Sequence, residues 1–476
     1  MREYNRFGFF VISVLAALLL PQIFREGMFM DGSLYSAVAV NYSRGEGTFW
    51  APHFSKVTMG FFHEQPPLMF GILGICFKIF GENLLTERFY AFIFFLIGLR
   101  VFLAIWKNIF SENQWLIRWN WMAVLFWVII PNTTWVAIHN LEENTMLVFV
   151  LLSIFFQVKI FYQKKSNTFL LSALAGISLF LAFLTKGFPG LFPLIFIPLH
   201  FIFFREHYRQ KSIYLKSFFT LIFVLSTLLA FVFIIPPASI QLNAWLNDRV
   251  LNSVKNVSNT SHRFEIIFDL LMQLVPVFVL FPVLWGLKFL KKLHSIRVDS
   301  QQKKHRLLFL FLAVSGSLPL IITREQRGFY LATSHPFYAI FFTLLLSPFF
   351  TALQRENWTK FKLNFFHSVS ILTLFVSIFL MFYLRKIPKR EPGKWNDINK
   401  VTSMLPYGSY LVYKGDMWND WDLQTGLIRK KYITLTSDST KSNYLLIVAD
   451  QKTEVNKNYS EIRSDFQYYR LYKRKQ

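Results

Sequence analysis

Four acidic residues lie beside long apolar segments, and the first of them, Asp31, could act as a general base. Asp31 follows the first apolar segment, Glu64 precedes a pair of prolines, and Glu142 and Glu143 lie between two further apolar segments. Partial desolvation raises the pKa of a carboxyl group towards the range useful for proton transfer. The alternative interpretation is local: Asp31 would be the N-cap of a helix that begins at Gly32, and the two glutamates would cap the next helix.

A second kind of chemistry is indicated at His63-Glu64-Gln65-Pro66-Pro67. The two prolines make a rigid turn, which restricts where His63 and Glu64 point. Glutamate and histidine are zinc ligands, so Glu64 could take part in a metal site that His262, from a later loop, completes. The alternative is an ordinary solvated loop.

Four cations lie beside apolar segments, at positions comparable to those of the acidic residues. They are Arg88, Lys186, Arg324 and Arg327. A lipid phosphate would pair with these cations, with lysine acting as a point charge and arginine as a bidentate hydrogen-bond donor. The alternative is that each side chain extends to ordinary lipid headgroups.

The elements that must position these residues are membrane spans. The chain has 476 residues, of which 54% are hydrophobic and only 16% charged, which excludes a soluble enzyme with a single core. Segments near the length needed to cross a bilayer predict about eleven transmembrane helices. They are Phe7 to Leu20, Phe89 to Trp106, Trp119 to Ala137, Met146 to Val158, Phe169 to Leu184, Phe188 to Phe204, Phe218 to Ile235, Leu270 to Leu287, Leu307 to Ile322, Phe329 to Phe350 and Phe365 to Leu384.

Positive charge predicts the topology. The formal net charge of +24 comes mostly from loops and the C-terminal tail, so it indicates cytoplasmic loops rather than nucleic-acid binding. Four basic loops alternate correctly as cytoplasmic: around Lys159 to Lys165, Arg205 to Lys216, Lys291 to Arg306 and Arg355 to Lys362. The N-terminus is then cytoplasmic, as an uncleaved signal-anchor, and the C-terminus lies outside.

The same alternation of inner and outer loops predicts three regions on the outer side of the membrane. They are a first loop, Arg25 to Glu87, a loop from Pro236 to Asp269, and a C-terminal α/β domain. The apolar run Pro67 to Phe80 is too short to cross and is predicted to be a juxtamembrane helix. We expect two domains, residues 1–384 in the membrane and residues 385–476 outside it. The single cysteine, Cys76, can form no internal disulfide.

The ordered motifs resemble the membrane glycosyltransferases of the GT-C type, specifically the group that contains protein O-mannosyltransferases and the aminoarabinose transferase of lipid A. The resemblance covers about Phe7 to Leu346. Its motifs are Asp31-x-x-x-Tyr35, Glu64-Gln65-Pro66-Pro67-Leu68, Gly81 and Arg88, Glu142 or Glu143, Lys186-Gly187, and the stretch Tyr330 to Pro336.

This resemblance implies a polyprenyl-phosphate-sugar donor, an active site on the outer face and inversion at the anomeric carbon. It implies that Asp31 is the base, with Glu64, Glu142 and Glu143 as further acidic site residues. The implied substrate-binding residues are Tyr35, Arg88, Lys186, Arg324, Arg327 and Tyr330, of which Lys186 and the two late arginines would hold the departing phosphate. Glu64 and His262 look similar to positions that bind zinc in the lipid A enzyme, so a divalent metal is a possible cofactor.

The chain departs from the family pattern at two positions. Gly32 stands where many members have a second acidic residue after Asp31, so a paired acid is in doubt. Gln65 stands where many have a lysine, so the donor head group can differ from that of the aminoarabinose transferase.

Two other functions stay open at this stage. A flippase or transporter of lipid-linked sugars would place ionisable residues near the midplane on broken helices, whereas here they gather at the outer boundary. A structural or assembly protein would not depend on Asp31. The enzyme is therefore favoured, with a lipid, glycan or protein hydroxyl as acceptor and the bacterial inner membrane as the expected location.

Overall fold

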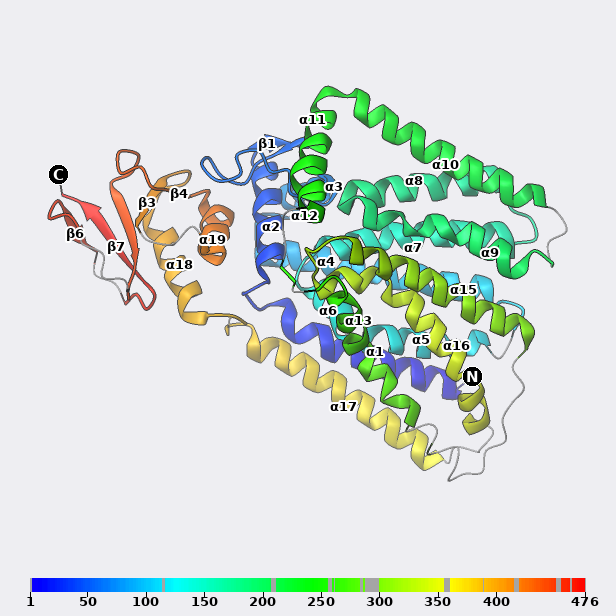
Figure 1. Cartoon of the computed structure of the whole chain (residues 1–476). Helices are drawn as coiled ribbons and strands as arrows, with labels where there is room; N and C mark the ends of the chain where they lie inside the picture. Colours follow the sequence, from blue (N-terminus) through cyan, green and yellow to red (C-terminus); the bar gives the residue numbers. More distant parts are fainter. Residues whose placement is uncertain are drawn as a thin grey trace.

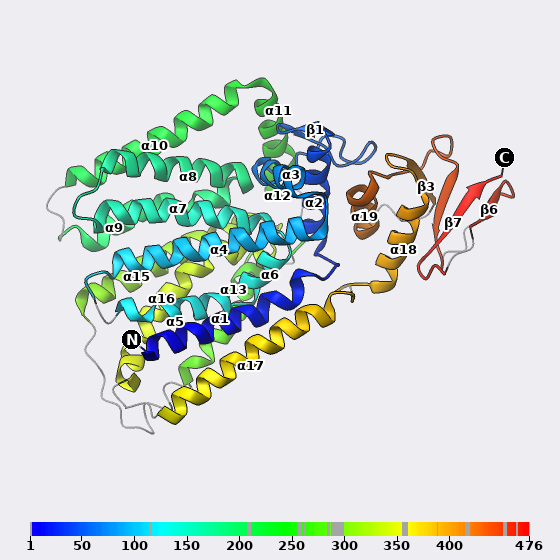
Figure 2. The same cartoon turned by 180° about the vertical axis from the view of Figure 1, so that it is seen from behind.

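The computed structural model describes residues 2–113, 116–206, 211–255, 259–260, 262–282, 286, 299–354, 360–387, 389–414, 419–450, 455–462 and 465–475. A bundle of long helices forms most of the molecule, and a small unit with strands lies beyond one end of it (Figure 1). The sheet of this unit has five strands. The N-terminus lies at the opposite end of the bundle, as the view from behind also shows (Figure 2).

Eight helices within the described residues are long and apolar enough to cross a membrane. They are α1 (Arg2–Ile23), α4 (Leu84–Ile109), α7 (Glu142–Tyr162), α8 (Thr168–Lys186), α10 (Lys211–Ile234), α13 (Glu265–Phe278), α15 (Ser300–Ser317) and α17 (Lys360–Leu384). The chain is a multi-pass membrane protein.

The other three predicted segments are also helical, but they are interrupted or short. A pair formed by η1 (Leu116–Trp119) with α5 (Asn120–Val128) and α6 (Pro131–Ile138) bends by 74°. Pro131 is the first residue of α6, where its ring ends the preceding helix. The remaining two segments are η2 (Phe188–Ile195) with α9 (Phe196–Phe204), and η5 (Gly328–Thr333) with α16 (His335–Gln354), while η4 (Leu318–Ile322) extends α15.

Helix α7 lies at the centre of the bundle. Of its most apolar stretch, 67% is buried, against 11% for α17, which packs along α1 at the periphery. α7 packs on α4 and α8 through a shared core that includes Phe102, Trp127 and Leu151. The acidic residues that begin α7 are therefore held by the most buried helix of the bundle.

A layer of shorter elements covers the end of the bundle nearest the strands, here called the site end (Figure 1). Its members are α2 (Met30–Ser43), the hairpin β1 (Gly47–Thr48) and β2 (Ala51–Pro52), α3 (Leu68–Phe80), α11 (Pro236–Ala244), the π-helix η3 (Trp245–Leu251) and α12 (Asn252–Lys255). The predicted helix after Pro67 is α3, whose Ile75, Ile79 and Phe80 are exposed, as expected of a helix at a membrane boundary.

The C-terminal segment is α/β, as predicted. It contains α18 (Pro392–Met404), β3 (Tyr410–Lys414), α19 (Trp421–Lys431), β4 (Thr434–Thr436), β5 (Tyr444–Val448), β6 (Tyr459–Glu461) and β7 (Tyr469–Arg474). The strand order is β4-β3-β5-β7-β6, with β3 parallel to both β4 and β5 and the other pairs antiparallel. The register sets Tyr410 beside Thr434 and Val412 beside Leu445. The domain boundary after Leu384 stays a prediction.

The described ends of the predicted basic loops lie at the end of the bundle opposite the site end. Lys164 follows α7, and Lys211 begins α10, at that end (Figures 1 and 2). Five of the predicted cations lie outside the described residues: Arg209, Lys291, Lys292, Arg297 and Arg355. Residues 283–285 and 287 of the segment Leu270 to Leu287 also lie outside them.

Candidate active site

Asp31 is the second residue of α2 and does not cap it. The helix begins at Met30, Phe29 is the N-cap, and no side chain forms a capping hydrogen bond. The interpretation of Asp31 as an N-cap is therefore wrong. Gly32 lets this turn pack closely, because a Cβ there would stand 1.8 Å from the carbonyl oxygen of His139. A second acidic side chain cannot follow Asp31 without moving that backbone.

The environment of Asp31 suits a general base. Burial raises the pKa of its carboxyl group to about 6, and the nearby Glu143 acts in the same direction. The positive charges of Lys186, Arg327 and Arg249 oppose this shift. Asp31 is thus ionised at neutral pH, with a proton affinity much higher than that of an exposed aspartate.

Glu142, Glu143 and Lys186 form a buried ionic cluster. The two glutamates begin α7 and Lys186 ends α8, so antiparallel packing of these helices brings them together. Lys186 Nζ lies 2.7 Å from Glu143 Oε1 and 3.5 Å from Glu142 Oε2, and all three side chains are buried. The glutamates do not merely cap α7: its N-cap is Leu141, and their carboxylates pair with the lysine.

Two tyrosines complete the surroundings of this cluster. The ring of Tyr330, in η5, lies 4.7 Å from Lys186 Nζ, in a cation–π contact. Burial raises the pKa of Tyr330 to about 12, and burial with Glu142 and Asp31 holds the pKa of Tyr35 well above its usual value. Both hydroxyl groups therefore stay protonated and can donate hydrogen bonds.

Arg249 is a further candidate site residue, which the sequence did not single out. It lies in the π-helix η3, where its guanidinium pairs with Glu64 at 3.1 Å and with Glu325 at 2.6 Å. Burial alone would lower its pKa, but the two carboxylates raise it. The sequence does carry a signal for it: Arg249 is a cation in the predicted outer loop Pro236 to Asp269. Cations on the outer side are uncommon, and Arg88 and Lys186 are candidates for the same reason.

A zinc ion held by Glu64 and His262 does not fit the residues present. The Glu64 carboxylate faces the guanidinium of Arg249, and its neighbour His63 pairs with Asp248 at 3.1 Å. His262 is exposed, and no group of three or more histidine, cysteine, aspartate or glutamate side chains within the described ranges could hold a metal. A metal-binding role for Glu64 and His262 therefore has no support from the geometry.

Arg324 and Arg327 have exposed side chains and lie in a loop that is hydrogen-bonded to its neighbours. The backbone of this loop is bonded to Asn259, and the side chain of Gln326 both accepts from Ile266 N and donates to the Arg263 carbonyl. Across the part of the chain that the structure describes, neither guanidinium has an ion-pair or hydrogen-bond partner. Arg327 is one of the charges that act on Asp31, so a free cation lies near the candidate base.

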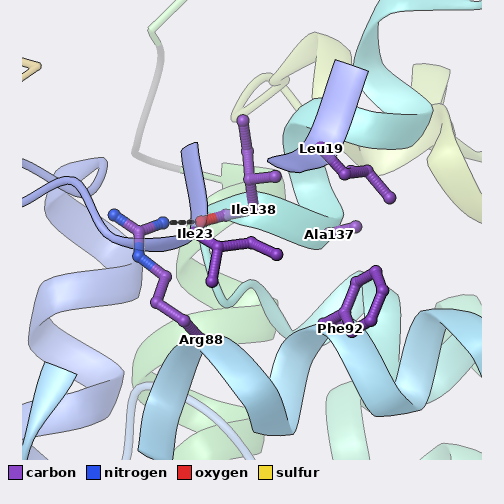
Figure 3. A pocket seen from close by; sticks show the side chains of 6 residues that line it. All are labelled: Leu19, Ile23, Arg88, Phe92, Ala137 and Ile138. Atoms are coloured by element: carbon purple, nitrogen blue, oxygen red, sulfur yellow. Dashed lines mark hydrogen bonds between the residues drawn. The ribbon is translucent and has the colours of Figure 1, made fainter. Parts of the chain in front are cut away.

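Arg88 joins three elements. Its guanidinium donates to the carbonyl of Ile138, at the end of α6, and to the carbonyl of Arg25, which follows α1, at 2.8 Å. Figure 3 shows Arg88 at the edge of a small pocket that is otherwise lined by apolar side chains. They are Leu19, Ile23, Phe92, Ala137 and Ile138. None of the acidic site residues lines this pocket.

Residues 64–231 match the dolichyl-phosphate-mannose-protein mannosyltransferase family. The matched segment contains Glu64, Arg88 and the cluster of Glu142, Glu143 and Lys186, whereas Asp31 precedes it. A comparison with the curated proteins finds no match.

Solved structures share the fold at low sequence identity. ArnT from Cupriavidus metallidurans bound to undecaprenyl phosphate has a TM-score of 0.65 and 12% identity, over 97% of each chain. Its apo form has a TM-score of 0.64 and 11% identity, over 97% of this chain and 96% of that one. The Archaeoglobus fulgidus oligosaccharyltransferase in complex with zinc and sulfate has a TM-score of 0.51 and 13% identity, over 92% of this chain and 68% of that one. The family match over residues 64–231 and the shared fold make the chain similar to membrane glycosyltransferases of the GT-C type.

Proposed function

We propose that the chain transfers a sugar from a polyprenyl-phosphate donor to a hydroxyl group of a lipid, glycan or protein, at the outer face of a bacterial inner membrane. The observation that carries this proposal is Asp31, a half-buried carboxylate whose pKa is raised to about 6 and which lies within the field of Arg327 and Arg249. The undecaprenyl phosphate bound to the structurally similar ArnT supports a donor of this class.

The proposed reaction is a single displacement. Asp31 accepts the proton of the acceptor hydroxyl while the acceptor oxygen attacks the anomeric carbon. The bond from that carbon to the phosphate oxygen breaks, and the polyprenyl phosphate leaves with the electron pair, so the configuration inverts. Positive groups held ready for the leaving phosphate would contribute most to the rate.

We assign the cations to two roles. Arg327 and Arg324 have free guanidinium groups among the described residues, so we assign the leaving phosphate to them. Arg249 would assist from its fixed position between Glu64 and Glu325. Lys186 is neutralised by Glu142 and Glu143, and its predicted contact with phosphate is less favoured than a role in holding the two acids beside Tyr330.

Sugar hydroxyls need polar partners as well. Glu142 and Glu143 would accept from them, and the protonated hydroxyls of Tyr35 and Tyr330 would donate. Arg88 is assigned a bracing role, since both of its bonds are to backbone carbonyls. No metal takes part in this proposal.

The test is transfer of radiolabelled sugar from a panel of polyprenyl-phosphate sugars, with purified protein in lipid and membrane extract as the acceptor. Asp31→Asn keeps the shape of the side chain but removes the base, and it should reduce transfer by at least 100-fold, about the minimum expected for general base catalysis. Asp438→Asn, which changes a half-exposed aspartate of the C-terminal segment, is the matched control. Equal transfer by wild type and Asp31→Asn would exclude this base, and turnover of no donor by folded wild type would favour the flippase.

A further inference from the structure

Helix α2 carries Asp31 and Tyr35 near its N-terminal end, and the C-terminal segment contacts the chain at both ends of this helix. In Figures 1 and 2, α2 stands between the bundle and the C-terminal segment, with α19 beside it. The chain distance between the partners exceeds 340 residues, so these contacts are a product of the tertiary fold.

At the N-terminal end, the linker that follows α17 crosses the chain just before α2. Lys389 N donates to the carbonyl of Glu26 at 2.8 Å, and Arg25 Nε donates to the carbonyl of Ile387 at 3.0 Å. The crossing is close, because a Cβ on Gly27 would stand 2.8 Å from Arg390 N. The linker is thus bonded to the residues that lead directly into α2.

His139 connects this linker to the first turn of α2. Its Nδ1 accepts the backbone N–H of Phe29, the N-cap of α2, at 2.8 Å. On the other side of the ring, Lys389 Nζ lies 3.2 Å from Nε2. The carbonyl of the same histidine packs against Gly32. One residue therefore sets the position of the turn that presents Asp31.

At the C-terminal end, Arg44 caps both helices. It is the C-cap of α2, and its guanidinium donates to the carbonyls of Ile428 at 3.0 Å and Arg429 at 2.9 Å, in the last turn of α19. Cationic donors there satisfy carbonyls that have no partner within the helix. Arg429 in turn pairs with the buried Glu87 at 2.7 Å, which ties α19 to α4.

We propose that the C-terminal segment holds α2 at both ends, with Arg44 and His139 as positioning residues for the transfer reaction. This rests on the proposed function of Asp31. Between the two attachments, Tyr35 and Val38 of α2 share one apolar cluster with Ile428 and Tyr432, so the helix is held along its length as well. Because the geometry of a catalytic base is sensitive to shifts of about 1 Å, loss of either attachment should slow the chemical step.

The first measurement does not depend on activity. Hydrogen exchange at the amides of α2 is compared among wild type, Arg44→Met and Lys389→Met. The matched controls are Arg474→Met, an exposed residue of β7, and the exposed Lys386→Met in the same linker. Exchange within α2 should accelerate on the order of tenfold in the first two variants and stay at the wild-type rate in the controls. Unchanged exchange in both variants would overturn the attachment.

The second measurement separates positioning from simple destabilisation. In Arg44→Met and Lys389→Met, kcat should fall on the order of tenfold while KM for the donor stays within about twofold. Lys389→Met replaces one half-buried side chain, so it can be used for this measurement if Arg44→Met does not fold. A wild-type kcat despite accelerated exchange, or an equal loss in the controls, would overturn the positioning role. Absence of transfer by wild type would instead contradict the proposed function, and the exchange comparison would still decide the attachment.

Discussion

Asp31 should set the acidic limb of the pH profile. Since its pKa is raised to about 6, the carboxylate is present above that pH, and kcat/KM should fall as the pH drops through it. Arg327 is one of the charges that hold this pKa down, so Arg327→Met should move the limb to higher pH. Arg474→Met is the control, and a limb that stays in place in Arg327→Met would argue against Asp31 as the titrating base.

Lys186 should be needed for stability as well as for the site. Lys186→Met leaves the buried Glu142 and Glu143 without their cation, and the cost of breaking a buried pair is about 3–5 kcal/mol. Thermal unfolding in detergent should show this loss. Lys164→Met breaks an exposed pair with Glu112 and should cost no more than about 1 kcal/mol. Similar melting temperatures for the two variants would show that the buried cluster is not ionised as described.

At the scale of elements, the junction of α8 and η2 depends on Gly187. Its φ is +77°, and a Cβ there would stand 2.3 Å from the ring of Trp245, at the start of the π-helix that carries Arg249. Gly187→Ala should therefore displace η3, raise KM for the donor and cost about 1–3 kcal/mol of stability. Gly45→Ala is the control for the effect of a positive φ alone, because φ of Gly45 is +84° and a Cβ there would have no neighbouring atom within 4 Å. Equal effects of the two substitutions would assign the loss to the backbone rather than to Trp245.

The elements themselves were largely predictable. All eleven apolar segments contain helix, and Pro67 and Pro131 mark the start of helices as proline favours. The sequence did not show the 74° bend between α5 and α6, or that Asp31 lies inside α2 rather than at its cap. Hydropathy reports burial over a window of residues, whereas bends and caps depend on individual backbone angles.

At the scale of the whole molecule, the prediction concerns orientation. The basic ends of α7 and α10 lie opposite the C-terminal segment, so the two ends should face opposite sides of the membrane. In a Cys76→Ser background, Asp438→Cys should react with an impermeant thiol reagent from outside intact cells, whereas Lys164→Cys should react only after permeabilisation. The reverse pattern would invert the proposed topology, and labelling of both in intact cells would contradict it.

The sequence by itself determined the membrane class, the helical character of the apolar segments, the short helix after Pro67 and the positions of most charged candidate residues at helix ends. These follow from local hydropathy and charge, which each segment carries independently of the others. Only the tertiary structure decided the partners: Lys186 with Glu142 and Glu143, Arg249 between Glu64 and Glu325, and Arg44 with the last turn of α19. Ion pairing and the pKa of Asp31 depend on distances of a few ångströms between segments far apart in the chain, and those distances arise from helix packing.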